Sequence, residues 1–389
     1  MKRGSFTTFA LALSLVLAFA SADAREFNLG TQIPLTGSLA RVGSATNEGI
    51  AVAVEIFNRE HKGKYSVKRT VIDDESSPAK AVAAIEQMAG QVDAFSGGYG
   101  SNIIGPASEA AARLGKVYIT SGGVARALVD RKLKTFFRIN NGEGYAKAMV
   151  GLIGDMNIKS VSMVHSTKEA TTDVANQVAE GLKAKGIKVT VHPFDPAITD
   201  FKPILHKIRL QDRPDVLAMI GYENDYVGIL RAGQVLKPDV KAVVGVWSLA
   251  TEQMAKEFPD LTEYVYGTST LPYPPKFDAP AAKKFAEVYK ELYGKSSDYL
   301  GVFGYVQTTL LLDAMLRAEE AGTLDKPGGL AEELRKTDTK TLIGRVKFDE
   351  GGDNPAFTHR MGQHQGEGVV LVWPADEATG KMVYPAKPW

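Results

Sequence analysis

Cysteine is absent from the 389-residue chain, and neither sign of charge is in excess, since 46 Lys and Arg residues balance 45 Asp and Glu residues. Without thiols, the protein can form no disulfide, no thiolate zinc site, no thiolate nucleophile and no lipidated N-terminal cysteine. A formal net charge of +1 provides neither a basic surface for nucleic acid nor an acidic tail. The composition, 44% hydrophobic and 23% charged, is typical of a globular protein, and the length predicts roughly two or three domains.

Apolar runs long enough to cross a bilayer are also missing, and the most apolar stretch, residues 9–20, lies near the N-terminus. Two basic residues precede this stretch, and Ala22 and Ala24 follow it at the two positions that a signal peptidase recognises. A transmembrane anchor would need about 20 apolar residues. The pattern therefore predicts a cleaved signal peptide at residues 1–24, an exported protein and no direct membrane anchor.

Motifs of phosphate binding and nucleophilic catalysis are lacking as well, since no phosphate loop, no G-x-G-x-x-G after a strand and no G-x-S-x-G occur. The histidines are scattered, and His359 and His364 are poorly spaced for joint metal ligation on a helix. The acidic segment 73–75 could hold a divalent metal, but such a loop after a strand is more often a turn or a helix cap. We therefore expect no metal, no cofactor and no enzymatic activity, and an exported α/β enzyme stays an alternative.

What the sequence does contain is a regular alternation of strand and helix patterns. Apolar runs such as 65–72 and 216–220 predict strands, and helical spacings such as 47–59 and 174–185 predict helices between them. Strands separated by helices of about ten to fifteen residues form parallel βαβ units with right-handed crossovers. A second series begins near Tyr145. The order predicts an α/β fold with two doubly wound parallel-sheet lobes.

Glycine and small polar residues follow three predicted strands of the first series, at 36–38, 96–101 and 121–123. Glycine permits tight turns and a close approach of a ligand to the backbone. The helix N-termini that follow would favour an anion such as a carboxylate. Because the carboxyl ends of parallel strands gather at one edge of a sheet, these loops predict a binding site there. Each loop taken alone could be an ordinary turn.

Short segments in a characteristic order carry a family resemblance. The most specific segment runs from Thr199 through Pro203 to Val216. The other matching segments are 33–37, 71–74, 105–108, 117–121 and 137–138. Over nearly the whole exported chain, this order resembles the periplasmic binding proteins of branched-chain amino acid ABC transporters, the leucine/isoleucine/valine-binding type. The resemblance implies the type I fold, in which two lobes joined by a three-crossover hinge close around one ligand.

The resemblance also implies a periplasmic, monomeric carrier that delivers a small molecule to an inner-membrane ABC permease. A periplasmic sensor that signals to a receptor would share the fold and stays an alternative. The implied crossovers would lie near Asn140, Leu271 and Asp349. The implied lobes are 25–139 with 273–348 (N-terminal) and 140–272 with 349–389 (C-terminal).

The family's amino-acid site carries over only in part. Ser101 stands where the family has a serine that binds the ligand carboxylate. Gly122, followed by Gly123, matches a backbone position that contacts the ligand, but Val124 stands where a threonine is expected. Tyr222 matches a tyrosine that contacts the ligand. The resemblance therefore implies these positions as ligand contacts.

The departures from the family's site concern the ligand ammonium. Trp247 stands where the family has an acidic residue that pairs with the ammonium, and residues 168–172 lack the expected Tyr-Gly pair. Removing the partner of a buried charge costs on the order of 3–5 kcal/mol. A site without the acid should thus discriminate against an α-ammonium by about two or more decades in affinity. Glu223 or Asp225 could replace the acid if their loop bends inward.

The hypothesis that follows is a small carboxylate ligand, either an amino acid or an aromatic or aliphatic acid without an adjacent ammonium. Tyr222 and Trp247 would form aromatic walls, while Ser101 and the amides near Gly122 would hold the carboxylate. Two alternatives stay open. Trp247 could belong to the hydrophobic core, and Arg41 could either pair with an anion in the cleft or be solvated.

Overall fold

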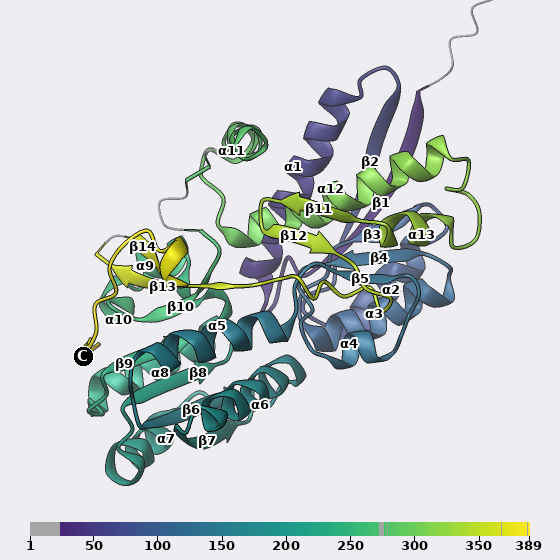
Figure 1. Cartoon of the computed structure of the whole chain (residues 1–389). Helices are drawn as coiled ribbons and strands as arrows, with labels where there is room; N and C mark the ends of the chain where they lie inside the picture. The colour runs from purple at the N-terminus through teal and green to yellow at the C-terminus, as the bar shows by residue number, and fades with distance from the viewer. Residues whose placement is uncertain (1–23, 272–275, 278, 367, 387) are drawn as a thin grey trace, which may run out of the picture.

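The computed structural model describes residues 24–271, 276–277, 279–366, 368–386 and 388–389 (Figure 1). Apart from Ala24, the predicted signal peptide lies outside the described residues, and so does most of the segment that follows Leu271. The described chain forms a five-stranded sheet, a seven-stranded sheet and a separate two-stranded ribbon. Each main sheet has helices on both faces, so the predicted α/β fold with two doubly wound lobes is confirmed.

The five-stranded sheet of the N-terminal lobe is parallel throughout, with the order β2-β1-β3-β4-β5. Its strands are β1 (Arg25–Ile33), β2 (Tyr65–Asp73), β3 (Ala94–Ser96), β4 (Val117–Thr120) and β5 (Phe136–Arg138). The helices between them are α1 (Ala40–Glu60), α2 (Pro78–Met88), α3 (Ser101–Arg113) and α4 (Ala127–Asp130). Three later helices pack into the same core: α11 (Pro280–Tyr293), α12 (Tyr299–Glu320) and α13 (Gly329–Arg335).

The seven-stranded sheet of the C-terminal lobe has the order β14-β13-β10-β9-β8-β6-β7. Its strands are β6 (Ser160–Ser166), β7 (Lys188–Phe194), β8 (Val216–Ile220), β9 (Ala242–Gly245), β10 (Tyr266–Ser269), β13 (Arg360–Gln365) and β14 (Gly368–Trp373). Its helices are α5 (Gly142–Asp155), α6 (Glu169–Ala184), α7 (Lys202–Lys207), α8 (Glu223–Leu236), α9 (Glu252–Glu257) and α10 (Pro259–Thr262). The late strands β13 and β14, yellow in Figure 1, pair antiparallel, so this sheet is mixed.

Strand β8 shows why the apolar runs become central strands. All five of its residues are buried, and they alternate between two cores. Val216, Ala218 and Ile220 face the core beneath α5 and α6, while Leu217 and Met219 face the core beneath α7 and α8. A parallel strand with helices on both faces must be apolar on both faces, which accounts for the continuous run.

Helix α12 is held close to α1 by glycines. A Cβ atom at Gly49 would lie 1.8 Å from the Gly301 carbonyl oxygen, and one at Gly304 would lie 2.1 Å from the Thr46 carbonyl oxygen. Only glycine permits such a backbone approach.

In the described chain, α12 is also long and apolar enough to span a membrane, but 83% of its most apolar window is buried inside the protein. It is therefore explained as a core helix.

The chain passes between the lobes three times, through what we call the hinge segments: 139–141, the connection from β10 to α11, and 348–359. Of the second segment, residues 270–271, 276–277 and 279 are described. The first and third are tied by a buried ion pair. Arg138 donates from Nε to Asp353 Oδ1 at 2.8 Å and from Nη2 to Asp353 Oδ2 at 2.7 Å. Asn354 donates from Nδ2 to the Ile139 carbonyl at 2.9 Å. The lobe limits, 25–139 with 273–348 and 140–272 with 349–389, stay a prediction.

One late strand joins neither main sheet. It is β12 (Gly344–Lys347), which pairs antiparallel with β11 (Asp338–Thr341) as a separate ribbon. Its apolar residues still reach the N-terminal core, where Phe348 packs edge-on against Phe137 at 5.1 Å between ring centres. Val346 and Phe348 are therefore buried, although β12 pairs with neither main sheet.

Candidate ligand-binding site

A small cavity lies between the lobes. Each residue that lines it stands either just after the carboxyl end of a strand or near the start of the helix that follows. The N-terminal lobe, or first lobe, contributes the loops after β3 and β4. The C-terminal lobe, or second lobe, contributes the starts of α5, α6 and α8 and the turn after β9. The cavity has about 260 Å³ of empty volume, including open solvent, and is lined by Tyr99, Ser121, Gly122, Val124, Tyr145, Ala170, Tyr222 and Trp247. This is the edge at which doubly wound sheets bind ligands.

The structure brings half of the sequence-predicted residues to this cavity. The lining includes Gly122, Val124, Tyr222 and Trp247. It does not include Arg41, Ser101, Gly123 and Glu223, which lie next to it or behind it. The four lining residues that the sequence did not single out are Tyr99, Ser121, Tyr145 and Ala170. The glycine-rich loop 96–101 was a signal for Tyr99, whereas no sequence pattern marked Tyr145, which lies in α5.

The two first-lobe loops pack against each other backbone to backbone. Gly98 and Gly100 both have positive φ values, +75° and +89°, which glycine tolerates best. The Gly100 amide donates to the Gly122 carbonyl at 2.9 Å. A Cβ atom at Gly122 would lie 2.3 Å from the Gly98 carbonyl oxygen and 2.7 Å from the Tyr99 Cα. Gly122 thus sets the position of Tyr99 in the cavity wall.

We expect Gly122→Ala to weaken ligand binding by about tenfold or more, because relieving the clash displaces the loop that carries Tyr99. The matched control is Gly90→Ala, since a Cβ at Gly90 meets no atom within 4 Å. Titration calorimetry on both variants checks this. Equal affinity of the two variants would show that the loop contact does not shape the site.

Ser101, at the start of α3, is 1% exposed and joins the same two loops. Its Oγ accepts the N–H groups of Val124 and Ala125, each at 3.1 Å. The Gly122 N–H donates to Thr120 Oγ1 at 3.0 Å. These amides therefore hold the loop in place, and the donor left on Ser101 is its own hydroxyl hydrogen. A role for Ser101 in binding a carboxylate stays a prediction.

Aromatic rings form the second-lobe wall. Tyr222 and Trp247 stack nearly parallel, with ring centres 5.6 Å apart and 3° between the planes, and Tyr145 lies 5.8 Å from Trp247. Trp247 is buried and packs in the core, so it belongs to the core and lines the cavity at once. Its φ of +52° is unusual for a bulky residue, and such strain gathers at functional sites. Lys168 lies over the Tyr222 ring at 4.7 Å.

Arg41 and Glu223, both predicted as possible ligand contacts, contact each other. Arg41 lies in α1 of the N-terminal lobe and Glu223 begins α8 of the C-terminal lobe, so their ion pair spans the cleft. Both side chains are largely buried, at 24% and 21% exposure. A second interlobe contact is the Arg126 N–H, which donates to Asp173 Oδ2 at 2.9 Å. The lobes are therefore in a closed arrangement.

Asp225, the other possible partner for an ammonium, caps α8. Its Oδ2 accepts the Tyr222 N–H at 2.8 Å, and burial raises its pKa. Burial also raises the pKa values of the Tyr99, Tyr145 and Tyr222 hydroxyls, so these groups stay neutral. Among the described residues that line the cavity, none carries a charged side chain.

The Arg41–Glu223 pair leads to a testable expectation. Because it can form only when the lobes are closed, Arg41→Gln and Glu223→Gln should each weaken ligand binding. A double-mutant cycle on Kd should give a coupling of roughly 1 kcal/mol, which is modest because both groups keep some exposure. Arg59→Gln, which breaks an ion pair with Glu291 within one lobe, is the control and should leave Kd unchanged. Strictly additive effects of the two substitutions would contradict a closure contact.

Two carboxylates of the acidic segment 73–75 accept hydrogen bonds from the loops after β1 and β2. Asp73 Oδ1 accepts the Leu35 N–H at 2.8 Å, and its Oδ2 accepts the Thr36 hydroxyl at 2.7 Å. Asp74 Oδ1 accepts the Ser76 N–H at 2.8 Å. In the described part of the chain, no three His, Cys, Asp or Glu residues group as metal ligands would. The carboxylates thus have structural partners in the β1 and β2 loops.

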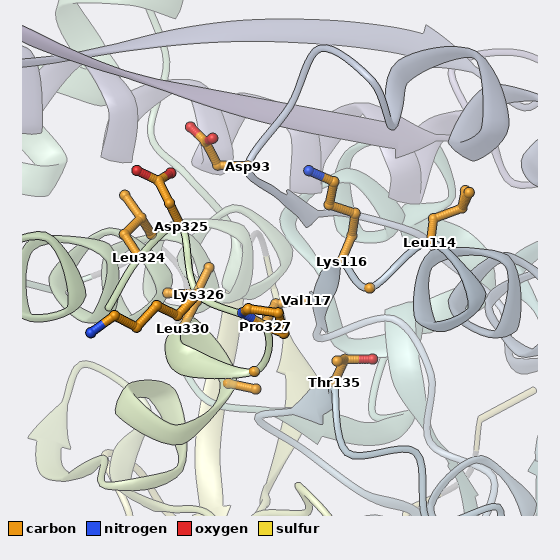
Figure 2. A pocket seen from close by; sticks show the side chains of 13 residues that line it. Asp93, Leu114, Lys116, Val117, Thr135, Leu324, Asp325, Lys326, Pro327 and Leu330 are labelled. Atoms are coloured by element: carbon orange, nitrogen blue, oxygen red, sulfur yellow. The ribbon is translucent and has the colours of Figure 1, made fainter. Parts of the chain in front are cut away.

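A larger hollow lies at the opposite edge of the first sheet (Figure 2). Asp93, Lys116 and Thr135 stand directly before β3, β4 and β5, so this hollow is at the amino ends of the strands. The segment 324–328 forms its other side. It encloses about 830 Å³, including open solvent. Ligands of doubly wound sheets bind at the carboxyl ends, so this hollow is not the candidate site.

Comparison with known proteins identifies the family. Residues 26–366 match the family model described as periplasmic binding protein. The chain belongs to this family. The resemblance to its leucine/isoleucine/valine-binding type is thereby confirmed, together with the type I fold. Members of the family are solute-binding proteins of the periplasm or the cell exterior.

Curated relatives of this periplasmic binding protein span nearly its full length. Leu/Ile/Val-binding protein homolog 8 of Brucella abortus is 26% identical, with 95% of each chain covered. Homolog 7 of Brucella suis is 23% identical, with 97% of this chain and 98% of the relative covered.

Solved structures show the same fold. The leucine-binding protein LivK of Thermotoga maritima matches with a TM-score of 0.79 at 23% identity, over 90% of this chain and 99% of LivK. A solute-binding protein of R. palustris in complex with benzoate matches with a TM-score of 0.79 at 17% identity, over 93% of this chain and 99% of that one. Proteins with this fold thus bind ligands both with and without an α-ammonium.

Proposed function

We propose that this protein is the exported, periplasmic solute-binding component of an ABC uptake system of the branched-chain amino acid type. It clamps a small carboxylate that lacks an α-ammonium and has a flat, aromatic body, and it presents this ligand to an inner-membrane permease as a monomer. The observation that carries the proposal is the absence of any charged side chain from the described cavity lining. The signal-peptide pattern at residues 1–24 supports export.

An α-ammonium would find no partner in this lining. Trp247 occupies the position of the family's acid, Asp225 caps a helix, and Glu223 pairs with Arg41. A buried ammonium without a carboxylate would cost several kcal/mol. Uncharged tyrosine hydroxyls and small residues instead suit a neutral, flat body.

The carboxylate can be held from the first lobe. Ser121 lines the cavity and has a hydroxyl that can donate to a carboxylate, and the Ser101 hydroxyl, which accepts two backbone amides, keeps one hydrogen to donate. Two cations lie beside the lining. Lys168 lies over the Tyr222 ring at 4.7 Å. Arg41 is close enough to Tyr99 to offset part of the rise that burial causes in the pKa of its phenol. The pKa of Arg41 is lowered by burial, which a ligand carboxylate would offset. Arg41 would then share its charge between Glu223 and the ligand.

A thermal-shift panel on refolded, ligand-stripped protein tests this function. It compares leucine, isoleucine and valine with benzoate and with aliphatic carboxylates that lack an amino group. A ligand at a thousand times its Kd stabilises by about 4 kcal/mol, which raises Tm by several degrees. We expect benzoate-type acids to raise Tm and the amino acids to leave it unchanged. The reverse pattern would show that the site binds the ammonium after all.

A further inference from the structure

A buried polar cluster adjoins the cavity behind Tyr145. The imidazole of His359 lies on the Tyr145 ring, with ring centres 3.8 Å apart, and Tyr299 meets His359 edge-on at 6.4 Å. Asn140 donates from Nδ2 to the Tyr145 hydroxyl at 3.4 Å. Asn140 and His359 belong to the first and third hinge segments, and Tyr299 begins α12 after the second. We call Asn140, Tyr299 and His359 the hinge cluster.

The hinge cluster has polar atoms that lack partners. Each of its three residues is at most 2% exposed. Among the described residues, no hydrogen-bond partner meets Asn140 Oδ1, Tyr299 Oη or either ring nitrogen of His359. A buried polar atom without a partner destabilises the folded state, and native proteins rarely leave one unpaired. Four unpaired atoms in one cluster therefore indicate a place for a polar group from outside the chain.

The cluster is one aromatic ring away from the ligand cavity. Tyr145 lines the cavity, and its ring packs against His359. The pKa of the Tyr299 hydroxyl is raised by burial and by the neighbouring hydroxyls of Tyr145 and Tyr99, which both line the cavity. Within the described chain, the 3.4 Å contact with Asn140 is the only hydrogen bond of the Tyr145 hydroxyl. Moving this ring aside would thus break one long hydrogen bond.

The free atoms define the chemistry of the group that fits. Asn140 Oδ1 only accepts, while Tyr299 Oη can donate and accept. Burial lowers the pKa of His359 far below its usual value, so the ring is neutral and offers one donor and one acceptor. A hydroxyl group, which donates one hydrogen bond and accepts others, matches this set. Phe303 and Phe357 pack around His359 and complete an apolar surround that suits an aromatic ring.

We infer that the hinge cluster is a specificity subsite that binds a hydroxyl group on the aromatic ring of the ligand. The preferred ligand class is then a hydroxylated aromatic carboxylate, held by its carboxylate at the first lobe and by its hydroxyl at the hinge. This inference rests on the proposed function, because it presupposes an aromatic acid in the cavity.

Titration calorimetry with 4-hydroxybenzoate, 4-methylbenzoate and benzoate tests the subsite on the refolded exported chain. The hydroxyl and the methyl group are similar in size, so their affinity ratio isolates the hydrogen bonds. We expect the Kd of 4-hydroxybenzoate to be lower than that of 4-methylbenzoate by a factor of about ten or more. Tyr299→Phe should bring this ratio close to one while the Kd of benzoate stays unchanged. Tyr289→Phe, which removes a hydroxyl that bonds Glu48 instead, is the control and should keep the ratio.

Equal binding of 4-hydroxybenzoate and 4-methylbenzoate to the unaltered protein would overturn the subsite and leave the proposed function intact. A ratio that persists in both Tyr299→Phe and His359→Phe would also overturn it, because the hydroxyl would then be bound elsewhere. Binding of leucine with no response to any benzoate would instead overturn the proposed function itself.

Discussion

Replacing Trp247 with glutamate is expected to convert the site into one that accepts α-amino acids. The substitution restores an acidic side chain at the position where the family pairs its ligand ammonium, and it removes one of the two stacked rings of the wall. Leucine should gain about two decades in affinity, the reverse of the cost of an unpaired buried ammonium. Benzoate should lose affinity as well, because its ring would lose one of the two stacked rings of the wall and pack against a buried carboxylate instead.

Titration calorimetry with leucine and benzoate measures both changes. Trp247→Phe is the matched control, since it keeps an aromatic wall without adding charge, and it should retain the benzoate preference. Circular dichroism and Tm establish that each variant is folded. A folded Trp247→Glu protein that still prefers benzoate would mean that this position does not face the ligand's polar end.

Breaking the buried ion pair of the hinge is expected to give the largest loss of stability. Asp353→Ala leaves the Arg138 guanidinium, which is 2% exposed, without its carboxylate partner. An uncompensated buried charge of this kind costs about 3–5 kcal/mol. Tm should fall by roughly 5–10 °C, which a calorimetric melt measures.

A matched control exists on the surface of the same lobe. Asp338 and Arg345 also form a two-pronged ion pair, at 2.7 Å for each contact, but both are solvent-exposed. Asp338→Ala should leave Tm nearly unchanged, because exposed pairs contribute little. The double variant Arg138→Met with Asp353→Leu should recover part of the lost stability, since it removes both charges. Equal Tm losses for Asp353→Ala and Asp338→Ala would contradict the role of burial.

The elements of the fold were largely predictable because their signals are local. The helical spacing at 47–59 lies in α1, and the apolar run 216–220 is β8, since burial on both faces dictates such a run. The exact ends of helices are less predictable, because a capping side chain can set them independently of the apolar spacing. Helix α12, for example, begins at Tyr299 because Asp298 Oδ1 accepts the amides of residues 300 and 301.

The candidate site was predictable only where it follows the carboxyl ends of strands. The convergence of loops after parallel strands indicated the region of Gly122, whereas Tyr222 and Trp247 were implied by the family resemblance; all three line the cavity. The pairing of Arg41 with Glu223 joins segments far apart in sequence, and no local pattern encodes it. Tyr145 escaped notice for the same reason, because its place in the wall depends on how α5 leaves the first hinge segment.

The most direct test of the central claim is a calorimetric comparison of two ligands that differ only in the α-ammonium. Leucine and 4-methylpentanoate form one such pair, and phenylalanine and 3-phenylpropanoate form an aromatic one. An uncharged cavity wall predicts that each ammonium-free acid binds about 100-fold or more tightly than its amino-acid counterpart. Tighter binding of leucine or phenylalanine than of its ammonium-free counterpart would contradict the account, because a carboxylate would then have to reach the ligand in the closed cleft.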